Sequence, residues 1–335
     1  MKIKVGLIGP GGFGNIHLAG YANNPNCKII ALSSRTKSHS ESAAKEFSVD
    51  KIYFGNDGWK KMLEKEEIDA ISICTPNYLH TPMALEALNQ GIHVLCEKPI
   101  STTHKELEAL EQATKQTDLI FFSSFQKRFN PIMPILREIL TNNILGKIIF
   151  INYYFSHYGP YTSWKAISEE KWFFNSKMAG GGVLLDLGVH CIDILRYLIG
   201  DYQKINGVNA NTSCIDMEYE DNCNVLINFQ NGILGEISVS WCNYPSEMIK
   251  IYGSKGNLTI DLHSKRPITC EPRTLKKNKL IKKVLSEKIH LKNYQARVID
   301  EFINSIVENR QFHPNFEDGK KAVEFVLEAY SLLRE

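Results

Sequence analysis

The sequence predicts an α/β protein in two parts, an N-terminal doubly wound parallel sheet and a C-terminal α/β part with a mostly antiparallel sheet. Two observations predict this division. Short aliphatic runs alternate with helix-like segments up to about residue 122, whereas later runs follow one another with turns between them. The chain also has 335 residues, more than one hydrophobic core usually serves. We therefore expect domains at 1–122 and 123–335, with C-terminal helices able to pack back on the first.

Aliphatic or β-branched runs in the first part predict four strands: Ile3–Ile8, Lys28–Leu32, Ile68–Cys74 and Ile92–Cys96. Between the last two lies a helical stretch, Thr81–Gln90, and the Gly91 that follows suits the left-handed position that closes a helix. Strands that alternate with helices are joined by right-handed crossovers, which produce a parallel sheet.

Runs in the second part predict six more strands: Ile148–Phe155, Ile205–Asn211, Asn224–Phe229, Ile233–Trp241, Met248–Tyr252 and Asn257–Leu262. Asn231-Gly232 between two of them is a strong hairpin signal, so this sheet should be largely antiparallel. Alternation puts Ile237, Val239 and Trp241 on one face. Because an apolar face exposed to water marks an interface, we expect a homodimer or homotetramer formed through this domain. Two helices are expected to close the chain, at 294–309 and 318–333.

The composition is that of a globular protein, with 43% hydrophobic and 23% charged residues. A formal net charge of +2 lacks the strong basic excess of a general nucleic-acid binder. None of the eight cysteines forms a CxxC pair, which favours reduced thiols over a disulfide framework or a zinc site. No signal peptide precedes the first strand, and no stretch approaches the ~20 apolar residues that span a membrane. We therefore expect a cytoplasmic protein without membrane contact.

A basic segment at 273–292 holds eight Lys or Arg residues and the single acid Glu287. Charge blocks usually face water, so a solvated loop is one interpretation. Attraction of an anionic substrate is the other, and the sequence does not decide between them.

The motif Gly9-Pro10-Gly11-Gly12-Phe13-Gly14 follows the first strand and opens a helix. Gly9 permits a tight turn, Gly11 lets a pyrophosphate approach the backbone, and Gly14 allows close helix–strand packing. The N–H groups and partial positive charge of the helix N-terminus favour phosphates. The prediction is a dinucleotide site, and the alternative is a glycine-rich turn without a ligand. The residues predicted to bind the dinucleotide are Gly9, Gly11, Gly12, Phe13 and Gly14.

An NAD-specific site places Asp or Glu about 20 residues further on, at the ribose 2′-hydroxyl. Here the second strand ends in Ser33-Ser34-Arg35, and the first acid is Glu41. Hydroxyls and a guanidinium suit a 2′-phosphate, which arginine binds through a planar fork of donors. Ser33, Ser34 and Arg35 therefore favour NADP, with NAD as the alternative.

Two strand ends carry polar groups to the sheet edge where open α/β folds bind ligands. Thr75-Pro76-Asn77 leads to His80 after one strand, and Glu97-Lys98-Pro99 follows the next. A lysine between Glu and Pro at this position is poised to enter a cofactor crevice, although alone it would be an ordinary surface lysine.

A run of three glycines, Gly180-Gly181-Gly182, precedes a largely apolar helix, Val183–Ile199. Burying polar groups without partners is unfavourable, so a polar stripe along such a helix requires a reason. A catalytic acid–base pair, a structural hydrogen-bonded network and a metal site are the three explanations. We predict the first, and no metal. The stripe lies on one face, at i, i+4, i+7 and i+11, and consists of Asp186, His190, Asp193 and Tyr197.

These motifs resemble, in order and spacing, the glucose-fructose oxidoreductase / inositol dehydrogenase / MocA (Gfo/Idh/MocA) family. The resemblance covers essentially the whole chain. Its motifs are the glycine loop, Cys74-Thr75-Pro76-Asn77-x-x-His80, Glu97-Lys98-Pro99, Gly180-Gly181-Gly182-x-x-x-Asp186-x-Gly188-x-His190 and Ile251-Tyr252-Gly253-Ser254-x-Gly256-x-Leu258.

The resemblance implies a Rossmann domain followed by an α/β domain with an open, mostly antiparallel sheet that is often used for oligomerisation. It implies that Lys98, Asp186 and His190 surround the reacting carbon. The positions that it places at the nicotinamide end are Thr75, Pro76, Asn77, His80, Glu97 and Lys98. The positions that it places near the substrate are Gln126, Arg128, Trp172, Asp186 and His190.

Such a site implies an NAD(P)-dependent oxidoreductase for a small polyhydroxylated substrate, namely a sugar, an inositol or a nucleotide sugar. Alcohol oxidation removes a hydride and a proton from one carbinol. His190 is the better base because its reference pKa of about 6.5 lies near neutrality. Asp186 would orient the imidazole or join a proton relay, and Lys98 would stabilise the alkoxide. Two rival functions stay open, an NAD-dependent glycoside hydrolase of the same fold and a non-enzymatic nucleotide-sensing regulatory protein.

Overall fold

The computed structural model forms two compact units, Met1–Phe129 with Asn293–Lys321 (unit 1) and Asn130–Lys292 with Ala322–Glu335 (unit 2). The residues that the structure describes are 2–162, 172–214, 218–264, 268–272, 275, 278–286 and 294–334.

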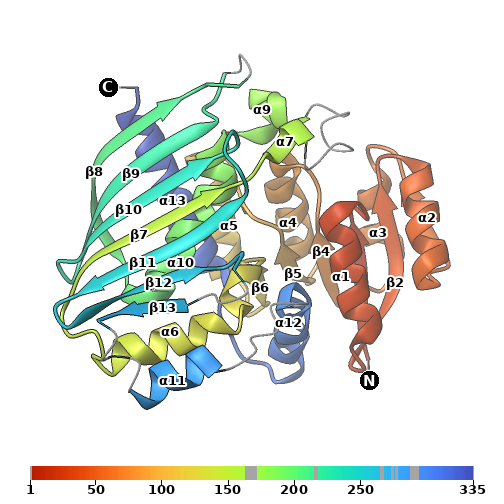
Figure 1. The fold of residues 1–335 in the computed structure, drawn as a ribbon. Helices are drawn as coiled ribbons and strands as arrows, with labels where there is room; N and C mark the ends of the chain where they lie inside the picture. The colour runs from red at the N-terminus through yellow and green to blue at the C-terminus, as the bar shows by residue number, and fades with distance from the viewer. Residues whose placement is uncertain are drawn as a thin grey trace. The chain divides into compact units, whose positions relative to one another are not determined.

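Unit 1 contains a six-stranded parallel sheet in the order β3-β2-β1-β4-β5-β6 (Figure 1). The chain adds β2 and β3 on one side of β1 and then crosses over to add β4, β5 and β6 on the other side. In open α/β sheets, ligands bind outside the carboxyl ends of the strands at such a switch point. The predicted parallel, doubly wound sheet is confirmed. Its strands are β1 Ile3–Ile8, β2 Cys27–Ser34, β3 Lys51–Phe54, β4 Ala70–Ile73, β5 His93–Cys96 and β6 Phe121–Ser123. Its helices are α1 Gly12–Asn23, α2 Lys37–Phe47, α3 Gly58–Lys65, α4 His80–Asn89, α5 His104–Lys115 and α12 Arg297–Val307.

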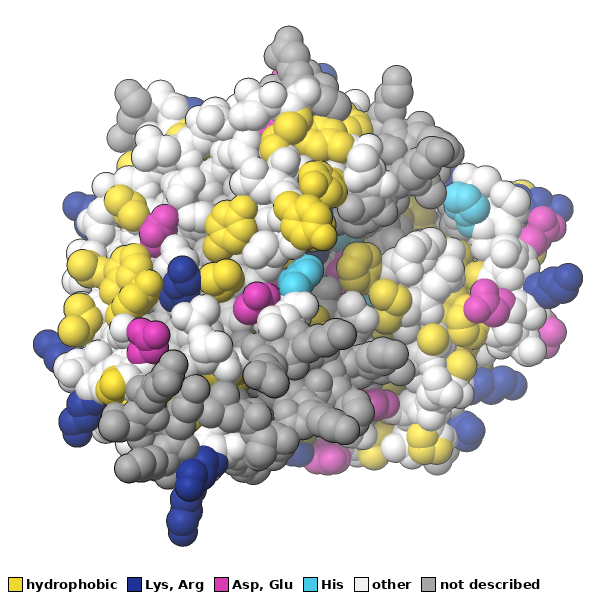
Figure 2. Space-filling view, in the orientation of Figure 1, with side chains coloured by type: hydrophobic (Ala, Val, Ile, Leu, Met, Phe, Trp, Pro, Cys, Tyr) yellow, Lys and Arg dark blue, Asp and Glu magenta, His cyan; other side chains and the backbone are white. Residues whose placement is uncertain are grey.

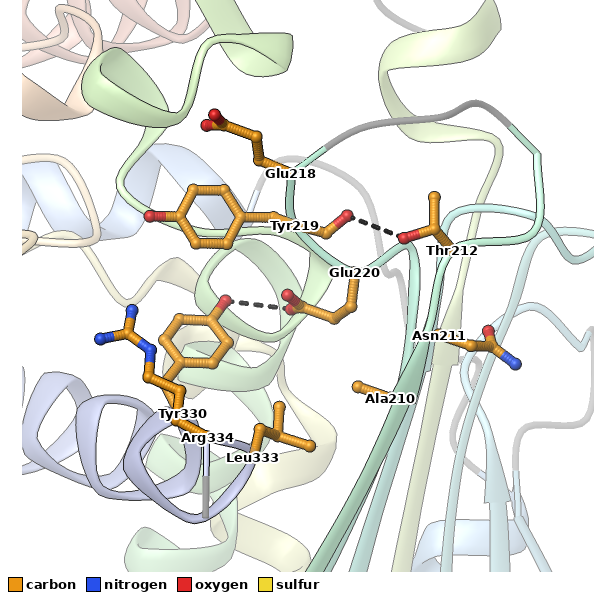
Figure 3. A pocket seen from close by; sticks show the side chains of 9 residues that line it. All are labelled: Ala210, Asn211, Thr212, Glu218, Tyr219, Glu220, Tyr330, Leu333 and Arg334. Atoms are coloured by element: carbon orange, nitrogen blue, oxygen red, sulfur yellow. Dashed lines mark hydrogen bonds between the residues drawn. The ribbon is translucent and has the colours of Figure 1, made fainter.

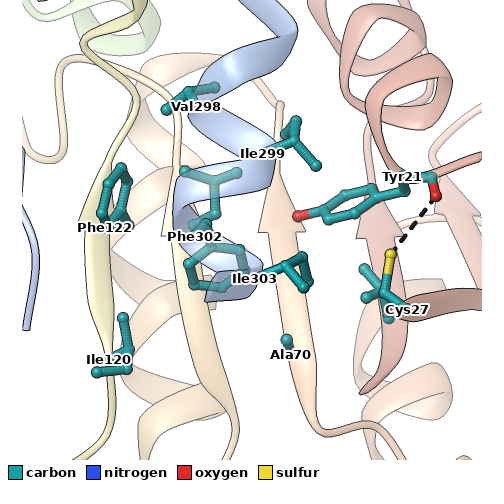
Figure 4. Close-up of a cluster of buried hydrophobic side chains, with 11 residues drawn as sticks. Tyr21, Cys27, Ala70, Ile120, Phe122, Val298, Ile299, Phe302 and Ile303 are labelled. Atoms are coloured by element: carbon teal, nitrogen blue, oxygen red, sulfur yellow. Dashed lines mark hydrogen bonds between the residues drawn. The ribbon is translucent and has the colours of Figure 1, made fainter. Parts of the chain in front are cut away.

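Helix α12 comes from near the C-terminus and completes the core of unit 1 (Figure 4). Its apolar residues fall on one stripe of the helix, as a core-facing helix requires. They lie against Val5, Leu95 and Phe122 of the sheet. Gly20 of α1 lets the two helices approach, because a Cβ there would lie 2.7 Å from Cγ1 of Ile299. The residues that α12 contributes are Val298, Ile299, Phe302 and Ile303.

Unit 2 contains a seven-stranded sheet in the order β13-β12-β11-β7-β10-β9-β8. The pair β7–β10 is parallel and the other pairs are antiparallel, so the predicted mostly antiparallel sheet is confirmed. Its strands are β7 Ile148–Ser156, β8 Tyr202–Asn211, β9 Asn222–Phe229, β10 Leu234–Ser240, β11 Ser246–Gly253, β12 Gly256–Asp261 and β13 Ile268–Glu271. The helices that include its residues are α6 Ile132–Thr141, α7 Gly159–Thr162, α9 Ser176–Ala179, α10 Val189–Ile199, α11 Lys279–Ser286 and α13 Phe316–Leu332.

The apolar face of β10 lies inside unit 2. Ile237, Val239 and Trp241 are 0 to 2% exposed, and β10 contacts the helical turn Leu184–Gly188. The expectation that this face is open to a partner is therefore wrong, because the chain's own helices cover it. The opposite face carries Leu226 and Leu234, which are 49% and 50% exposed.

One helical run, Ser176–Ile199, is long and apolar enough to cross a membrane by length and composition, with a window of mean hydropathy 1.5. This corrects the expectation that no stretch approaches that length. The window is 89% buried inside the protein, as a core helix of a globular protein is. The basic segment 273–292 lies largely outside the described residues, so neither interpretation of it is tested.

Candidate active site

The glycine loop between β1 and α1 is closed on one side. Gly9 has φ +90°, and a Cβ there would lie 2.4 Å from the carbonyl oxygen of Cys74. A Cβ at Gly14 would lie 2.1 Å from the carbonyl oxygen of Gly9. Both positions therefore exclude every side chain, as the motif predicts.

The other side of the loop is open. A Cβ at Gly11 or Gly12 would have nothing within 4 Å, and Phe13 is exposed. Gly11 occupies the N-cap of α1 without a side-chain hydrogen bond, so the first N–H groups of the helix are left to a ligand or to water. This backbone suits a pyrophosphate, and the residues present fit a dinucleotide.

The three cofactor-binding residues predicted at the end of β2 differ in their exposure to solvent. The side chain of Ser33 is buried, and its carbonyl oxygen accepts the N–H of Gly9 at 2.8 Å. Ser34 is half-buried and Arg35 is exposed. The first acid, Glu41, pairs with Lys37 at 3.3 Å on α2. Arg35 and Ser34 are thus the accessible groups at this strand end.

His80 joins the segments that follow β4 and β5. Its Nδ1 lies 2.7 Å from the carbonyl oxygen of Pro99, and its Nε2 lies 2.8 Å from that of Thr75. Burial lowers the pKa of His80, and the two carbonyl contacts offset only part of that effect. The ring is therefore buried between the two loops, where it fixes their backbone beside Lys98.

Glu97 is buried, and the adjacent Lys98 is half-buried. Its Oε1 accepts hydrogen bonds from Nε2 of His17 at 2.9 Å and from Oγ of Ser124 at 2.6 Å. Burial alone would raise the pKa of Glu97, but these two donors and the charge of Lys98 hold the pKa below its usual value. Through these two bonds the carboxylate anchors Glu97, and with it the adjacent Lys98, to α1 and to the residue that follows β6. His17 was not among the site residues predicted from the sequence, although a histidine on the inner face of α1 was a visible signal.

The helix formed by residues 183–199 carries Asp186 and His190 and is called the Asp186 helix. Asp186 and His190 are 6% and 4% exposed. The first part of the helix, Leu184–Gly188, is a wider π-helical turn rather than the predicted α-helix. Such turns occur frequently at functional sites. Nε1 of Trp241 donates to Oδ2 of Asp186 at 3.1 Å, a partner that the sequence did not suggest.

The three further substrate candidates are placed differently. Arg128 forms a buried ion pair with Asp318 at 2.8 Å, and Asp318 also accepts from Nδ1 of His313 at 2.6 Å. Gln126 lies beside Arg128 in the helical turn Gln126–Phe129 of unit 1. Trp172 is buried in unit 2.

The structure groups the predicted site residues by unit. The glycine loop, Thr75–Asn77, His80, Glu97 and Lys98 belong to unit 1, and Asp186 and His190 belong to unit 2. The meeting of Lys98 with Asp186 and His190 in one crevice therefore stays a prediction.

A second polar cluster joins the strand ends of unit 2. Ligand-capable atoms of Cys214, Asp221 and Cys242 lie within 4.8 Å of one another. The oxygens of Asp221 accept the N–H groups of Ser213 and Cys214 and, at 2.9 Å, the hydroxyl of Tyr161. These donors occupy the carboxylate, which thereby binds the backbone of Ser213 and Cys214 after β8.

A parallel sheet with an open glycine loop, followed by an α/β unit with an acid–histidine helix, defines a class of two-domain nucleotide-dependent oxidoreductases. The chain belongs to the Gfo/Idh/MocA family. A model described as "Oxidoreductase family, NAD-binding Rossmann fold" matches residues 3–125, and one described as "GFO/IDH/MocA C-terminal domain" matches residues 135–259.

Named relatives and solved structures share this organisation. The chain is 30% identical to levoglucosan dehydrogenase of Pseudarthrobacter phenanthrenivorans over 62% of its own length and 54% of that protein, so the match spans about half of that relative. It is 26% identical to myo-inositol 2-dehydrogenase of Thermotoga maritima, over 77% of this chain and 75% of that protein. The fold also resembles the WlbA dehydrogenase of Bordetella pertussis in complex with NADH and UDP-GlcNAcA, with TM-score 0.87, 19% identity and coverage of 99% and 96%.

Proposed function

We propose that the protein is an NAD(P)-dependent dehydrogenase that transfers a hydride between nicotinamide and a secondary hydroxyl or ketone carbon of a sugar, inositol or nucleotide sugar. The observation that carries this proposal is the buried pair Asp186 and His190, at 6% and 4% exposure, on a helix that packing alone would leave apolar. The names of the relatives, which include sugar and inositol dehydrogenases, support the substrate class.

In the proposed mechanism the bound nicotinamide would accept the hydride, and side chains of the protein accept and donate the hydroxyl proton. His190 takes the hydroxyl proton, since imidazole titrates near neutrality. Asp186, held by the indole of Trp241, orients the imidazole. Lys98 stabilises negative charge on the substrate oxygen. In the reverse direction the same groups donate a proton to a ketone oxygen.

Substitution of His190 tests the chemistry. We expect His190→Ala to lower kcat by about 10²–10⁴-fold, the usual contribution of general acid–base catalysis. Lys98→Met should lower kcat and also weaken cofactor binding. The measurement is steady-state kinetics of the full chain on a panel of polyols and nucleotide sugars with both cofactors, and the melting temperature is taken on the same preparations.

The matched control is His263→Ala, which removes an exposed histidine of unit 2. This control should keep wild-type turnover. Near-wild-type kcat in His190→Ala would contradict the catalytic assignment, and a lowered melting temperature with intact kcat would make His190 structural. Net reduction of one cofactor per substrate consumed separates the dehydrogenase from the hydrolase of the same fold, which returns its cofactor unchanged.

For the cofactor we propose a preference for NADP. Arg35 is exposed at the end of β2, Lys37 follows it on α2, and the first acid is already paired with Lys37. The cations of Arg35 and Lys37 and the hydroxyl of Ser34 are groups that suit a 2′-phosphate.

Arg35→Ala should weaken NADPH binding by about tenfold or more, because charged hydrogen bonds to phosphate are strong. NADH binding should change little, and so should both affinities in the control Lys45→Ala, which removes an exposed cation of the same helix region. Titration by nicotinamide fluorescence measures the dissociation constants of NADPH and NADH for both variants. Tighter binding of NADH than of NADPH by the wild-type protein would refute the preference.

A further inference from the structure

The Asp186 helix begins without a cap of its own. The first N–H groups of a helix have no partners within it, and a preceding Ser, Thr, Asp or Asn usually supplies one. Here the preceding residues are Gly180–Gly182, which have no side chains to offer. Val183, at the cap position, makes no side-chain hydrogen bond.

Two residues that are distant in sequence satisfy these N–H groups. The N–H of Gly182 donates to the hydroxyl of Tyr330 at 3.0 Å. The N–H of Val183 donates to the backbone carbonyl of Glu220 at 2.9 Å. The N–H of Leu184 donates to the carboxyl Oε1 of Glu220 at 2.8 Å. Three successive donors thus receive acceptors from Glu220, just before β9, and Tyr330, on α13.

Glu220 and Tyr330 are also bound to each other. The Tyr330 hydroxyl donates to Oε1 of Glu220 at 3.0 Å (Figure 3). The same oxygen therefore accepts from both Tyr330 and Leu184, and the hydroxyl both donates and accepts. The Tyr330 hydroxyl, Oε1 of Glu220 and the Glu220 carbonyl oxygen thus all take part in holding the start of the helix.

The glycine run is what permits this approach. A Cβ at Gly182 would lie 2.1 Å from the carbonyl oxygen of Glu220 and 2.7 Å from its Oε2. A Cβ at Gly181 would lie 2.6 Å from the hydroxyl oxygen of Tyr330. Side chains at either position would push the capping groups away from the helix.

We propose that Glu220 and Tyr330 are positioning residues that cap the Asp186 helix from outside and thereby set the π-helical turn that presents Asp186 and His190. This inference rests on the proposed catalytic use of Asp186 and His190. Because Asp186 lies only three residues beyond Val183, loss of the cap would displace it within the first turn. A displacement of about 1 Å at a reacting group lowers turnover strongly.

The cap also contains a group that titrates near neutrality. Burial raises the pKa of Glu220 to about 7, because its three hydrogen-bond donors, the N–H groups of Leu184 and Glu220 itself and the Tyr330 hydroxyl, do not make up for lost water and the neighbouring Asp221 is also negative. Opening of the cap would return this carboxyl to water, where its pKa is ordinary, so the capped state binds the proton more tightly than the opened state. The cap should therefore hold the helix more tightly at pH 6 than at pH 8. The titratable groups that face Glu220 are Tyr330 on α13 and Tyr219, Asp221 and Cys223 around the start of β9, and Arg334 lines the adjoining cavity of about 300 Å³.

The test combines hydrogen–deuterium exchange of the segment 182–190 with steady-state kinetics on the full chain. Tyr330→Phe removes only the hydroxyl, and Glu220→Ala removes the carboxyl acceptor. We expect exchange of this segment to rise about tenfold or more in both, kcat to fall at least fivefold, and the cofactor KM to stay unchanged. Glu220→Gln keeps an amide oxygen for the N–H of Leu184, so it should restore most of kcat and remove the difference in exchange between pH 6 and pH 8.

The matched control is Glu218→Gln, two residues away on the same loop, where the exposed carboxyl lines the cavity. It should match the wild type in exchange and in kcat. Unchanged exchange in Tyr330→Phe and Glu220→Ala overturns the cap, whatever the activity. Faster exchange with unchanged kcat in an active enzyme overturns the positioning role. If the wild-type protein turns over no substrate, the proposed function fails, and the exchange rates still decide whether the cap exists.

Discussion

At the scale of single residues, two buried carboxyl groups show how neighbours decide ionisation. Glu97 and Glu220 are 6% and 7% exposed, yet their pKa values move in opposite directions. Glu97 faces His17 and the charge of Lys98, which outweigh burial. The charged neighbour of Glu220 is Asp221, which adds to burial. The pKa of Glu97 is therefore lowered, whereas the pKa of Glu220 is raised to about 7.

The raised pKa of Glu220 predicts how stability varies with pH. Its folded pKa, about 7, lies above the ordinary 4.5, so the folded state binds the proton more tightly. The resulting stabilisation is fully present below pH 4.5 and is lost as pH rises through about 7, and its upper limit is on the order of 3 kcal/mol. Glu220→Gln should remove this loss, so its melting temperature should fall less than that of the wild type between pH 5 and pH 8. Glu218→Gln should keep the wild-type slope, and parallel pH curves for wild type and Glu220→Gln would contradict the prediction.

The sequence predicted individual residues best where a local motif carries the reason. The turn at Gly9 and the tight contact at Gly14 follow from the strand–turn–helix pattern alone. The ion pair of Arg128 with Asp318 did not, because the two residues lie 190 positions apart. The capping contacts of Glu220 have the same character, since they exist only when separate segments have folded together.

At the scale of elements, the start of the Asp186 helix departs most from its predicted form. The spacing of its polar residues predicted a regular α-helix, and the structure has a π-helical turn at Leu184–Gly188. Periodicity in sequence cannot distinguish the two over so few residues. We attribute the wider first turn to the proposed external cap, which comes from segments distant in sequence.

Gly182→Ala tests this element. The added methyl group would meet backbone of Glu220 at 2.1 Å, and overpacking of this kind usually lowers the free energy of unfolding by about 1–3 kcal/mol. Turnover should fall with it because the helix start must shift. Urea unfolding and kcat measure both effects. Gly207→Ala is the control, since a Cβ at that strand position has nothing within 4 Å, and an equal loss in both variants would argue against a specific contact.

Most strands were predictable from their aliphatic runs, and three were not. The missed strands are β3 Lys51–Phe54, β6 Phe121–Ser123 and β13 Ile268–Glu271, with three or four residues each. Strands this short carry little periodicity of their own. β4 and β5 also have four residues each, but the aliphatic runs that predicted them are longer, Ile68–Cys74 and Ile92–Cys96. The three missed strands are fixed by pairing with longer neighbours, a property of the sheet rather than of the segment.

At the scale of the molecule, the open face of the unit 2 sheet replaces the covered face as the candidate for self-association. Figure 2 shows hydrophobic side chains in several groups over these strands, among polar and charged ones. Leu226 and Leu234 are about half exposed there, and the rings of Phe150 and Tyr252 lie 5.8 Å apart. The alternation of β10 was predicted correctly, but which face the helices cover depends on the tertiary fold.

We predict that the protein forms a homodimer or homotetramer through this open face. Leu226→Lys with Leu234→Lys should shift the mass in multi-angle light scattering to that of the 38.1 kDa chain, because charges are excluded from apolar interfaces. Val307→Lys changes an exposed apolar residue of α12 in unit 1 and should leave the assembly intact. A monomeric wild-type protein at micromolar concentration would refute the prediction.

The contribution of α12 to the core of unit 1 has a consequence for biosynthesis. The ribosome releases residues 2–129 first, but the surface formed by Val5, Leu95 and Phe122 receives its cover from α12, beyond residue 296. All of Asn130–Lys292 emerges in between, and unit 2 also waits for Ala322–Glu335, so the nucleotide-binding unit exposes apolar surface during synthesis of most of the chain. Contacts between such distant segments form slowly, and nascent chains that wait in this state are prone to aggregate. The core of the first unit can therefore be completed only when the C-terminal segment has been synthesised.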